Sequence, residues 1–238
     1  MHDFFFVLVP QNFPFLLQGA LVTLKLSTLS MASGIIIGFV VALGRISGNR
    51  LLNGILVTYV EIWRDVPLIV QLLVIYFTLP SIGISLPAFW AGVLGLSLNL
   101  GAHLSEVFRS AIISIDPGQR EAGKSIGMSR LMVLKRVTLP QALRIAVPTV
   151  GGYFISLLKD SSLVSFISVN ELLRNGTIVI ANTFRSMEVY LMVAIIYFIM
   201  SFVASRLVRL VEQALTPKHQ RQRSFLAKTH TVETATLP

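Results

Sequence analysis

The stretch Gln119–Pro140, which reads QREAGKSIGMSRLMVLKRVTLP, decides how this chain is organised, because it is a polar, basic segment set between long apolar runs. The residues just before Gly127 suit a short helix, and Gly127 can take the left-handed conformation that ends a helix without a Cβ clash. A second amphipathic helix is expected to follow, capped by Ser129 and stopped by Pro140. Two short helices joined at a glycine and tethered to apolar segments predict a docking surface for a partner.

The composition excludes a soluble globular protein. Of the 238 residues, 54% are hydrophobic and only 13% are charged, and the mean hydropathy is +0.75, so we expect an integral membrane protein in contact with the lipid bilayer. The net charge of +9 would suggest nucleic acid in a soluble protein, but basic residues of membrane proteins gather in cytoplasmic loops, so no nucleic-acid partner is expected. The chain has no cysteine and its four histidines are far apart in the sequence, so no metal site is expected. No cofactor motif, nucleophilic triad or paired carboxylates are predicted, and a cleaved signal peptide is not expected.

The apolar runs predict an all-α membrane protein with about five transmembrane helices. Residues 1–217 are expected to form one transmembrane domain, and the polar segment 218–238 a disordered cytoplasmic tail. Segment 163–185 mixes polar and apolar residues too densely for a span, so short helices packed inside the protein are expected there. The expected spans are 20–43, a broken span made of 51–63 and 68–79, then 88–112, 145–158 and 187–210.

The distribution of Lys and Arg gives the expected orientation. These residues are concentrated in segments 45–64, 109–144 and 206–238, whereas 1–19 and 78–90 contain none. Because positive loops stay in the cytoplasm, we expect an external N-terminus, a cytoplasmic C-terminus and a cytoplasmic docking loop.

Residues Gly118–Ser125 also fit the phosphate-loop formula G-x-x-x-x-G-K-[ST] letter for letter. A phosphate loop needs a buried strand before it, a helix after it and a parallel sheet around it. The soluble segment is too short for such a sheet, and Gly127 and Pro140 cut short the helix that should follow. We therefore expect no nucleotide site and no enzymatic activity in this chain.

The loop resembles the coupling loop of the permeases of ATP-binding cassette (ABC) importers. The likeness rests on Glu121-Ala122, on the small residue Gly123, on Gly127 and, twelve residues later, on Leu139-Pro140. This family usually has Ala where the chain has Gly123, a change expected to loosen the first helix by about 1 kcal/mol.

Two further segments, 59–64 and 67–71, resemble the polar amino-acid permeases of the histidine, glutamine, arginine and opine type, although Asp65-Val66 replaces a usual Gly-Thr. The resemblance implies a type I importer permease in the bacterial inner membrane, taking up a polar amino acid or a derivative. It also implies three partners: a separate ATPase subunit bound to the loop, an external solute-binding protein, and a second permease copy or a homologous permease.

Asn99, His103 and Glu106 are spaced i, i+4, i+7 along the third expected span, with Arg109 one turn further. A structural account makes Glu106 and Arg109 an ion pair and lets Asn99 bond a neighbouring helix. A functional account makes the row a polar path, since ionisable groups in a span are costly. In the resembling family a Tyr is usual where His103 stands.

The sequence from Lys159 to Val164 resembles a stretch that the family places on the translocation path, which implies that Asp160, Ser161 and Ser162 line it. A Lys159–Asp160 pair is the structural alternative, although adjacent helical residues point about 100° apart. The alternative function is an ion-coupled secondary transporter with Glu106 or Asp160 as the proton carrier.

Overall fold

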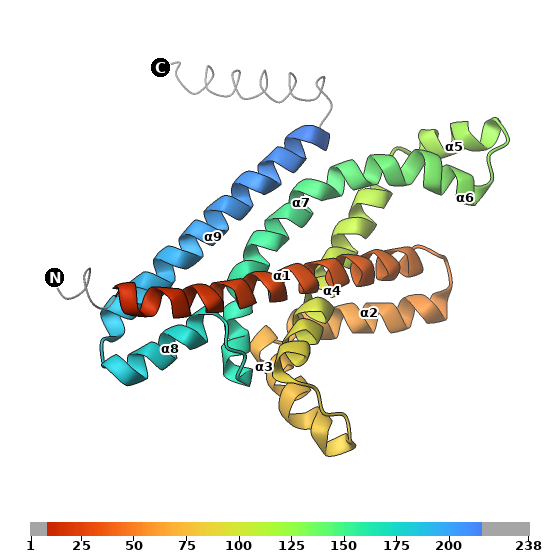
Figure 1. Ribbon diagram of the computed structural model, residues 1–238. Coiled ribbons are helices and arrows are strands. Elements are labelled where there is room, and N and C mark those ends of the chain that lie inside the picture. Colours follow the sequence, from red (N-terminus) through yellow and green to blue (C-terminus); the bar gives the residue numbers. More distant parts are fainter. Residues whose placement is uncertain (1–8, 216–238) are drawn as a thin grey trace, which may run out of the picture.

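The computed structural model describes residues 9–215, and within that range the chain is helical and contains no strand (Figure 1). The expected all-α architecture is therefore confirmed, whereas the predicted tail 218–238 lies outside the described residues. The long helices are α1 (Val9–Arg45), α4 (Ala88–Ile113), α7 (Leu139–Asp160) and α9 (Ser186–Leu215). By length and composition, three segments in the described range can cross a membrane, or up to four if one bent pair counts as a span. The polar residues of α4 lower its hydropathy, so the count of five spans stays a prediction.

Helix α4 forms the centre of the molecule and packs against α1, α2, α3 and α7. The contact with α1 is close because glycines face it. A Cβ on Gly34 would lie 2.8 Å from Leu100, and a Cβ on Gly38 would lie 2.8 Å from Leu104. The small-xxx-small spacing of these two glycines thus brings two membrane helices together.

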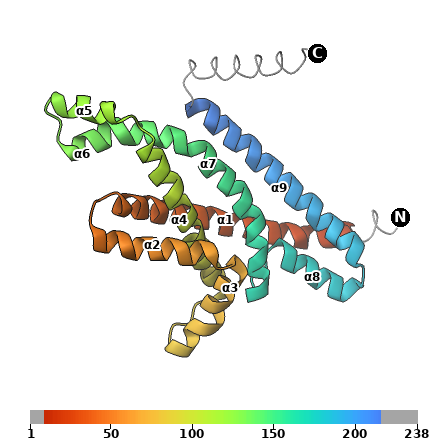
Figure 2. The same cartoon turned by 180° about the vertical axis from the view of Figure 1, so that it is seen from behind.

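The second apolar run is broken, as expected. Helix α2 (Arg50–Asp65) runs back alongside α1, and α3 (Leu68–Leu73) continues into a π turn and a 3₁₀ turn that end at Ile82 (Figure 2). The two halves bend by 107° at Val66-Pro67, where the residue before a proline is forced into an extended conformation. The buried side chain of Gln71 donates from Nε2 to the carbonyl oxygens of Trp63 (3.0 Å) and Val66 (2.8 Å). It thereby satisfies backbone groups that the break would leave unpaired in an apolar environment.

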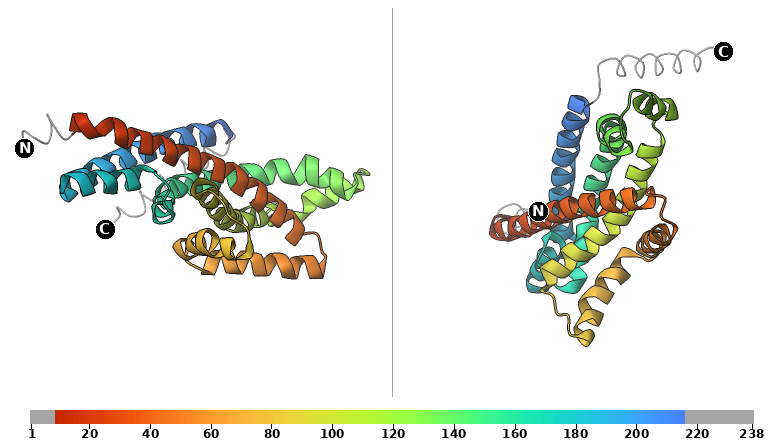
Figure 3. Two further views of the ribbon diagram at one scale, coloured as in Figure 1. Left: turned by 60° about the horizontal axis from the view of Figure 1, so that its bottom comes forward. Right: turned by 90° about the vertical axis from the view of Figure 1, so that its right-hand side faces the viewer.

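The segment expected to contain short internal helices forms a 3₁₀ turn (Ser161–Ile167) and α8 (Leu172–Thr183), which packs on α1 and α9. Helices α5 (Pro117–Ser125) and α6 (Arg130–Val133) project beyond the other elements at one end of the molecule (Figure 3). Together these elements place the candidate docking segment at the end opposite α8.

Candidate coupling surface and polar path

The first helix of the projecting segment begins and ends with side-chain and backbone caps. Asp116 accepts a hydrogen bond from the backbone N–H of Gly118 at 2.6 Å, and Pro117 occupies the first turn. At the other end Gly127 has φ +82° and donates to Lys124 O at 2.9 Å, while Met128 donates to Gly123 O at 3.1 Å. This bond pair is the Schellman motif, so the predicted role of Gly127 as a left-handed helix end is confirmed.

The second helix starts as predicted but does not stop as predicted. Ser129 caps it by accepting a hydrogen bond from Met132 N at 3.3 Å. The helix then passes through a π turn (Leu134–Thr138) into α7, so the expectation that Pro140 ends it is wrong. In the π turn Leu139 N bonds Leu134 O, five residues back, and the wider turn gives the proline ring room. The predicted fourth span, 145–158, is accordingly part of one continuous helix.

The two short helices pack together through Gly123. This glycine is buried, and a Cβ at its position would lie 2.9 Å from Val133 Cγ2. The absence of a side chain at this position therefore lets α5 pack closely against the following helix. Glu121 and Ala122 are exposed, as is Pro140, and Leu139 is half-buried.

The outer surface of the segment is apolar for a position that projects from the molecule. Ile126 is 79% exposed and Leu131 59% exposed, and Met132 lies beside them in the sequence and is also exposed. Exposed apolar residues rimmed by polar ones are typical of a protein-docking surface. We call Ile126, Leu131 and Met132, with Glu121 and Ala122, the coupling surface.

The phosphate-loop alternative does not survive in this geometry. The residues that match its formula lie within α5, where the N–H of Gly118 already bonds the side chain of Asp116 and that of Gln119 bonds the Asp116 carbonyl oxygen. A phosphate cradle needs those groups free in a loop, and the described residues contain no sheet to support one.

The polar row on α4 is held by protein partners. Asn99 donates from Nδ2 to Trp63 O (2.7 Å) and to Gln71 Oε1 (3.1 Å), and so joins α4 to the break between α2 and α3. The carboxylate of Glu106 pairs with Arg45 and also accepts from Arg109 Nε (3.0 Å) and Nη2 (2.8 Å). The structural alternative weighed from the sequence included the pairing with Arg109 but not the one with Arg45, which lies at the C-terminal end of α1.

His103 is the residue of this row that contacts α7. Its ring lies 5.7 Å, centroid to centroid, from the ring of Tyr153. Asp160 follows Tyr153 by seven residues, which places it two turns along on the same side of α7. Asp160 is exposed and makes no salt bridge with Lys159 within the described range.

The two serines after Asp160 differ in access. Ser161 is fully buried and donates to Leu158 O at 2.8 Å, whereas Ser162 is half-buried. The exposed side of α7 also carries small and polar residues at helical spacing, Thr149, Gly152 and Ser156. This side is poorly suited to lipid and suits water or another protein surface.

One polar cluster was missed by the sequence analysis. Glu171 is fully buried at the start of α8 and accepts hydrogen bonds from Tyr197 Oη (2.6 Å), Leu173 N (2.9 Å) and Arg174 N (2.8 Å). A Glu directly before a predicted short helix is the signal that identifies it, because its side chain can cap that helix. Within the described range no three His, Asp or Glu side chains gather in a way that suits a metal ion.

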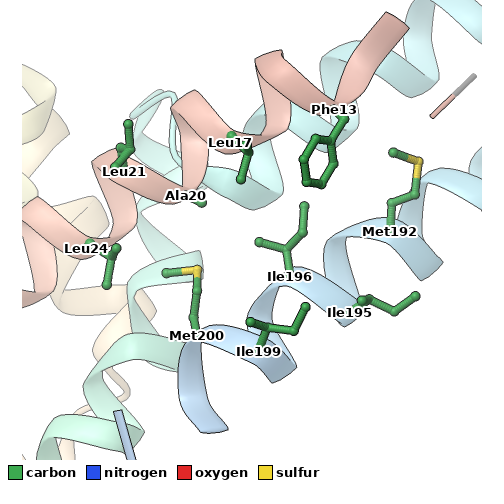
Figure 4. Close-up of a pocket in the computed structure, with 10 residues that line it drawn as sticks. All are labelled: Phe13, Leu17, Ala20, Leu21, Leu24, Met192, Ile195, Ile196, Ile199 and Met200. Atoms are coloured by element: carbon green, nitrogen blue, oxygen red, sulfur yellow. The ribbon is translucent and has the colours of Figure 1, made fainter. Parts of the chain in front are cut away.

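A hollow of about 550 Å³ between α1 and α9 is apolar throughout (Figure 4). Its walls carry side chains such as Phe13, Leu17, Ile196 and Met200. A charged or zwitterionic solute would lose its hydration there without gaining a polar partner, so this hollow is not the candidate path.

The comparisons with known proteins agree with this geometry. The family described as binding-protein-dependent transport system inner membrane component matches residues 34–217. The glutamine transport system permease GlnP of Escherichia coli K12 is 37% identical over 204 residues, which cover 85% of this chain and 93% of GlnP. The L-cystine transport system permease TcyB of Bacillus subtilis 168 is 40% identical over 210 residues, covering 87% and 90% of the two chains.

Solved structures give the same fold. A crystal structure of an amino acid ABC transporter with histidines matches with a TM-score of 0.82 and 37% identity, covering 88% of this chain and 98% of that one. The inward-facing methionine ABC transporter MetNI matches with a TM-score of 0.67 at 24% identity, which bears on the fold alone. The expected fold, that of a type I importer permease, is confirmed.

Proposed function

Because this chain belongs to the family of inner membrane components of binding-protein-dependent transport systems, we propose that it is the permease subunit through which an ABC importer takes up a polar amino acid or a derivative of one. It is a membrane permease and not the ATPase, since ATP hydrolysis in this family belongs to a separate subunit. The substrate class is taken from relatives named for glutamine and cystine transport.

The observation that carries this proposal is the coupling surface. A pair of short helices projects from the end of the molecule, its shape fixed by Gly123 and Gly127, and it presents Ile126 and Leu131 outward. An apolar, rigid projection of this kind suits a groove on an ATPase subunit. Movement of that subunit would reach α4 and α7 directly, because the segment follows α4 after a short connection and runs without a break into α7.

The transport path is proposed to run along α4 and the exposed side of α7. Asp160 is exposed and Ser162 is half-buried, and both supply acceptors for an ammonium group. His103 on α4 contacts Tyr153, which lies on the same side of α7 as Asp160. The polar atoms of Asn99, Glu106 and Ser161 bond other parts of the protein. We therefore propose that these residues position the helices that line the path. The small polar residues on α7 suit a second permease, as two copies or with a homologous chain, facing the same path.

The proposed orientation puts the coupling surface in the cytoplasm and the N-terminus outside the bacterial inner membrane. It rests on the cationic residues of segment 109–144, which would remain on the cytoplasmic side. The opposite loop, with exposed Ile82 and Ile84, then faces the external solute-binding protein that delivers the substrate.

A cysteine cross-link tests the coupling surface, because the chain has no cysteine of its own. Ala122→Cys, exposed on α5, should form a cross-link to the cognate ATPase subunit in the assembled complex. Phe166→Cys is the control, since Phe166 is 63% exposed in the 3₁₀ turn at the far end of α7. A cross-link from position 166 and none from position 122 would overturn the proposal.

A further inference from the structure

A second hollow, of about 460 Å³, lies where the C-terminal ends of α1 and α4 meet α5 and α6. Three cationic side chains line it: Arg120 and Lys124 from α5, and Arg130 from α6. Of the described residues that line it, none is acidic, and most of the others are apolar, Leu43 and Ile113 among them. The hollow therefore combines a concentrated positive charge with an apolar wall.

These cations have no acidic partner within the described range. The two ion pairs found there both belong to Glu106. Arg120 donates from Nη2 to the backbone oxygen of Ile112 at 2.7 Å, and this neutral acceptor does not balance its charge. Three like charges gathered around one hollow, with no acidic side chain in its lining, favour the binding of an anion there.

An apolar portion of the anion would fit against α1, because a row of apolar residues on that helix leads to the hollow. Ile36, Val40, Leu43 and Ser47 follow the spacing i, i+4, i+7, i+11 and so share one side of the helix. Ile36 is 65% exposed and Val40 62% exposed, whereas Leu43 and Ser47 line the hollow. The apolar part of this row, from Ile36 to Leu43, is about 10 Å long, which is roughly a third of the thickness of a bilayer core.

We propose that this hollow binds the phosphate headgroup of an anionic phospholipid, with an acyl chain lying along Ile36 and Val40. The proposal rests on the orientation proposed above, which puts the hollow at the cytoplasmic leaflet, where basic pockets between helices bind such headgroups. The bound lipid would join α1 and α4 to both coupling helices. It would thereby make ATPase coupling sensitive to the lipid composition of the membrane.

Native mass spectrometry of the full-length chain in neutral detergent tests this, with phosphatidylglycerol and phosphatidylcholine as the probes. Each cation contributes about fivefold to anionic-lipid affinity, so Arg120→Gln/Lys124→Gln/Arg130→Gln should weaken phosphatidylglycerol binding on the order of 100-fold. The matched control, Lys135→Gln/Arg136→Gln/Arg144→Gln, removes the same charge from exposed side chains that do not line the hollow. It should stay close to the wild-type chain, and an equal loss in both triple variants would overturn the proposal.

A second pair of variants keeps the test valid if the triple variant does not fold. Ser47→Glu places a negative charge in the hollow and leaves its cations intact, whereas Ser125→Glu places it on the exposed side of α5, outside the lining. Phosphatidylglycerol binding should fall in Ser47→Glu and persist in Ser125→Glu. Unchanged binding in Ser47→Glu would contradict the proposal.

Two other occupants of the hollow, a soluble anion or a protein partner, would give different results in these experiments. If excess inorganic phosphate displaces phosphatidylglycerol from the wild-type chain, the hollow is a site for soluble anions and the lipid proposal is wrong. If the triple variant keeps phosphatidylglycerol but no longer copurifies with the ATPase subunit, the hollow docks protein instead. Labelling of cysteines introduced on the two sides of the membrane tests the orientation separately, so a failure of lipid binding is distinguishable from a failure of the proposed function.

Discussion

The carboxylate of Glu106 pairs with the guanidinium of Arg45, sixty-one positions away in the sequence, and this contact ties the end of α1 to α4. The same carboxylate accepts two hydrogen bonds from Arg109. The side chains of Arg45, Glu106 and Arg109 are 13%, 24% and 33% exposed, so the three charges are shielded from solvent in part. Glu106 and Arg109 of this cluster lie on α4 shortly before α5. The cluster therefore fixes the position of the helix that leads into the two short helices α5 and α6.

Removing the charge of Glu106 should lower the stability of the fold rather than weaken substrate recognition. Glu106→Gln leaves the shielded Arg45 without a countercharge, and we expect a loss of about 1–3 kcal/mol in the free energy of unfolding. Thermal unfolding of the purified chain measures this. Arg45→Met added to Glu106→Gln should recover part of the loss. Unchanged stability combined with lost uptake would instead make Glu106 a ligand of the substrate.

Gly127→Val should separate coupling from folding. Nothing lies within 4 Å of the position of a Cβ at Gly127, so the cost comes only from its φ of +82°, a conformation that a β-branched residue adopts with difficulty. We expect a local cost of about 1–3 kcal/mol, a misplaced second helix and weaker retention of the ATPase subunit on copurification.

Gly83→Val is the matched control for this substitution. Gly83 has φ +86° and an equally open surrounding, but it lies in the loop before α4. It should carry the same strain and keep the ATPase. Equal retention by both variants would remove Gly127 from the coupling mechanism.

Asp160→Asn should weaken transport. If the carboxylate accepts a charge-assisted hydrogen bond from the substrate's ammonium group, its loss costs about 1.5–3 kcal/mol and lowers uptake roughly 10- to 150-fold. Uptake at varied substrate concentration, together with the yield of assembled complex, measures this. Recovery of uptake in Lys159→Met/Asp160→Asn would show that the two side chains merely neutralise each other.

The start and end of the two short helices, α5 and α6, and the break after α2 could be predicted where the residues that cause them act on near neighbours in the sequence. Ser129 and Gly127 act on backbone groups within a few residues, and the proline at the break between α2 and α3 acts on its own neighbour. Pro140 was misread because a π turn, which has no distinct sequence signal, makes room for its ring. Local chemistry is thus sufficient for caps and breaks but not for helix register.

The polar contacts between helices were less accessible to sequence analysis. The row from Asn99 to Glu106 follows from helical periodicity alone, whereas its partners Gln71 and Arg45 lie on other helices. The bonds that Glu171 makes to α9 are likewise set by how the helices pack. Such pairings depend on tertiary contacts that no local pattern encodes.

The proposed orientation predicts which side of the membrane each loop faces. Ser85 and Gln119 are both exposed, and the chain has no other cysteine to react. With a membrane-impermeant thiol reagent applied from outside intact cells, Ser85→Cys should be labelled and Gln119→Cys should be labelled only after lysis. The reverse pattern would put the coupling surface outside the cell and away from any ATPase.

Reconstitution in liposomes tests the account most directly. The chain alone should neither hydrolyse ATP nor take up labelled amino acid under a proton gradient. With its cognate ATPase subunit, any second permease and the solute-binding protein, ATP should drive uptake, and omission of either the ATPase or the binding protein should abolish it. ATP hydrolysis by the chain alone, or uptake that follows the proton gradient without ATP, would contradict its role as an ABC importer permease.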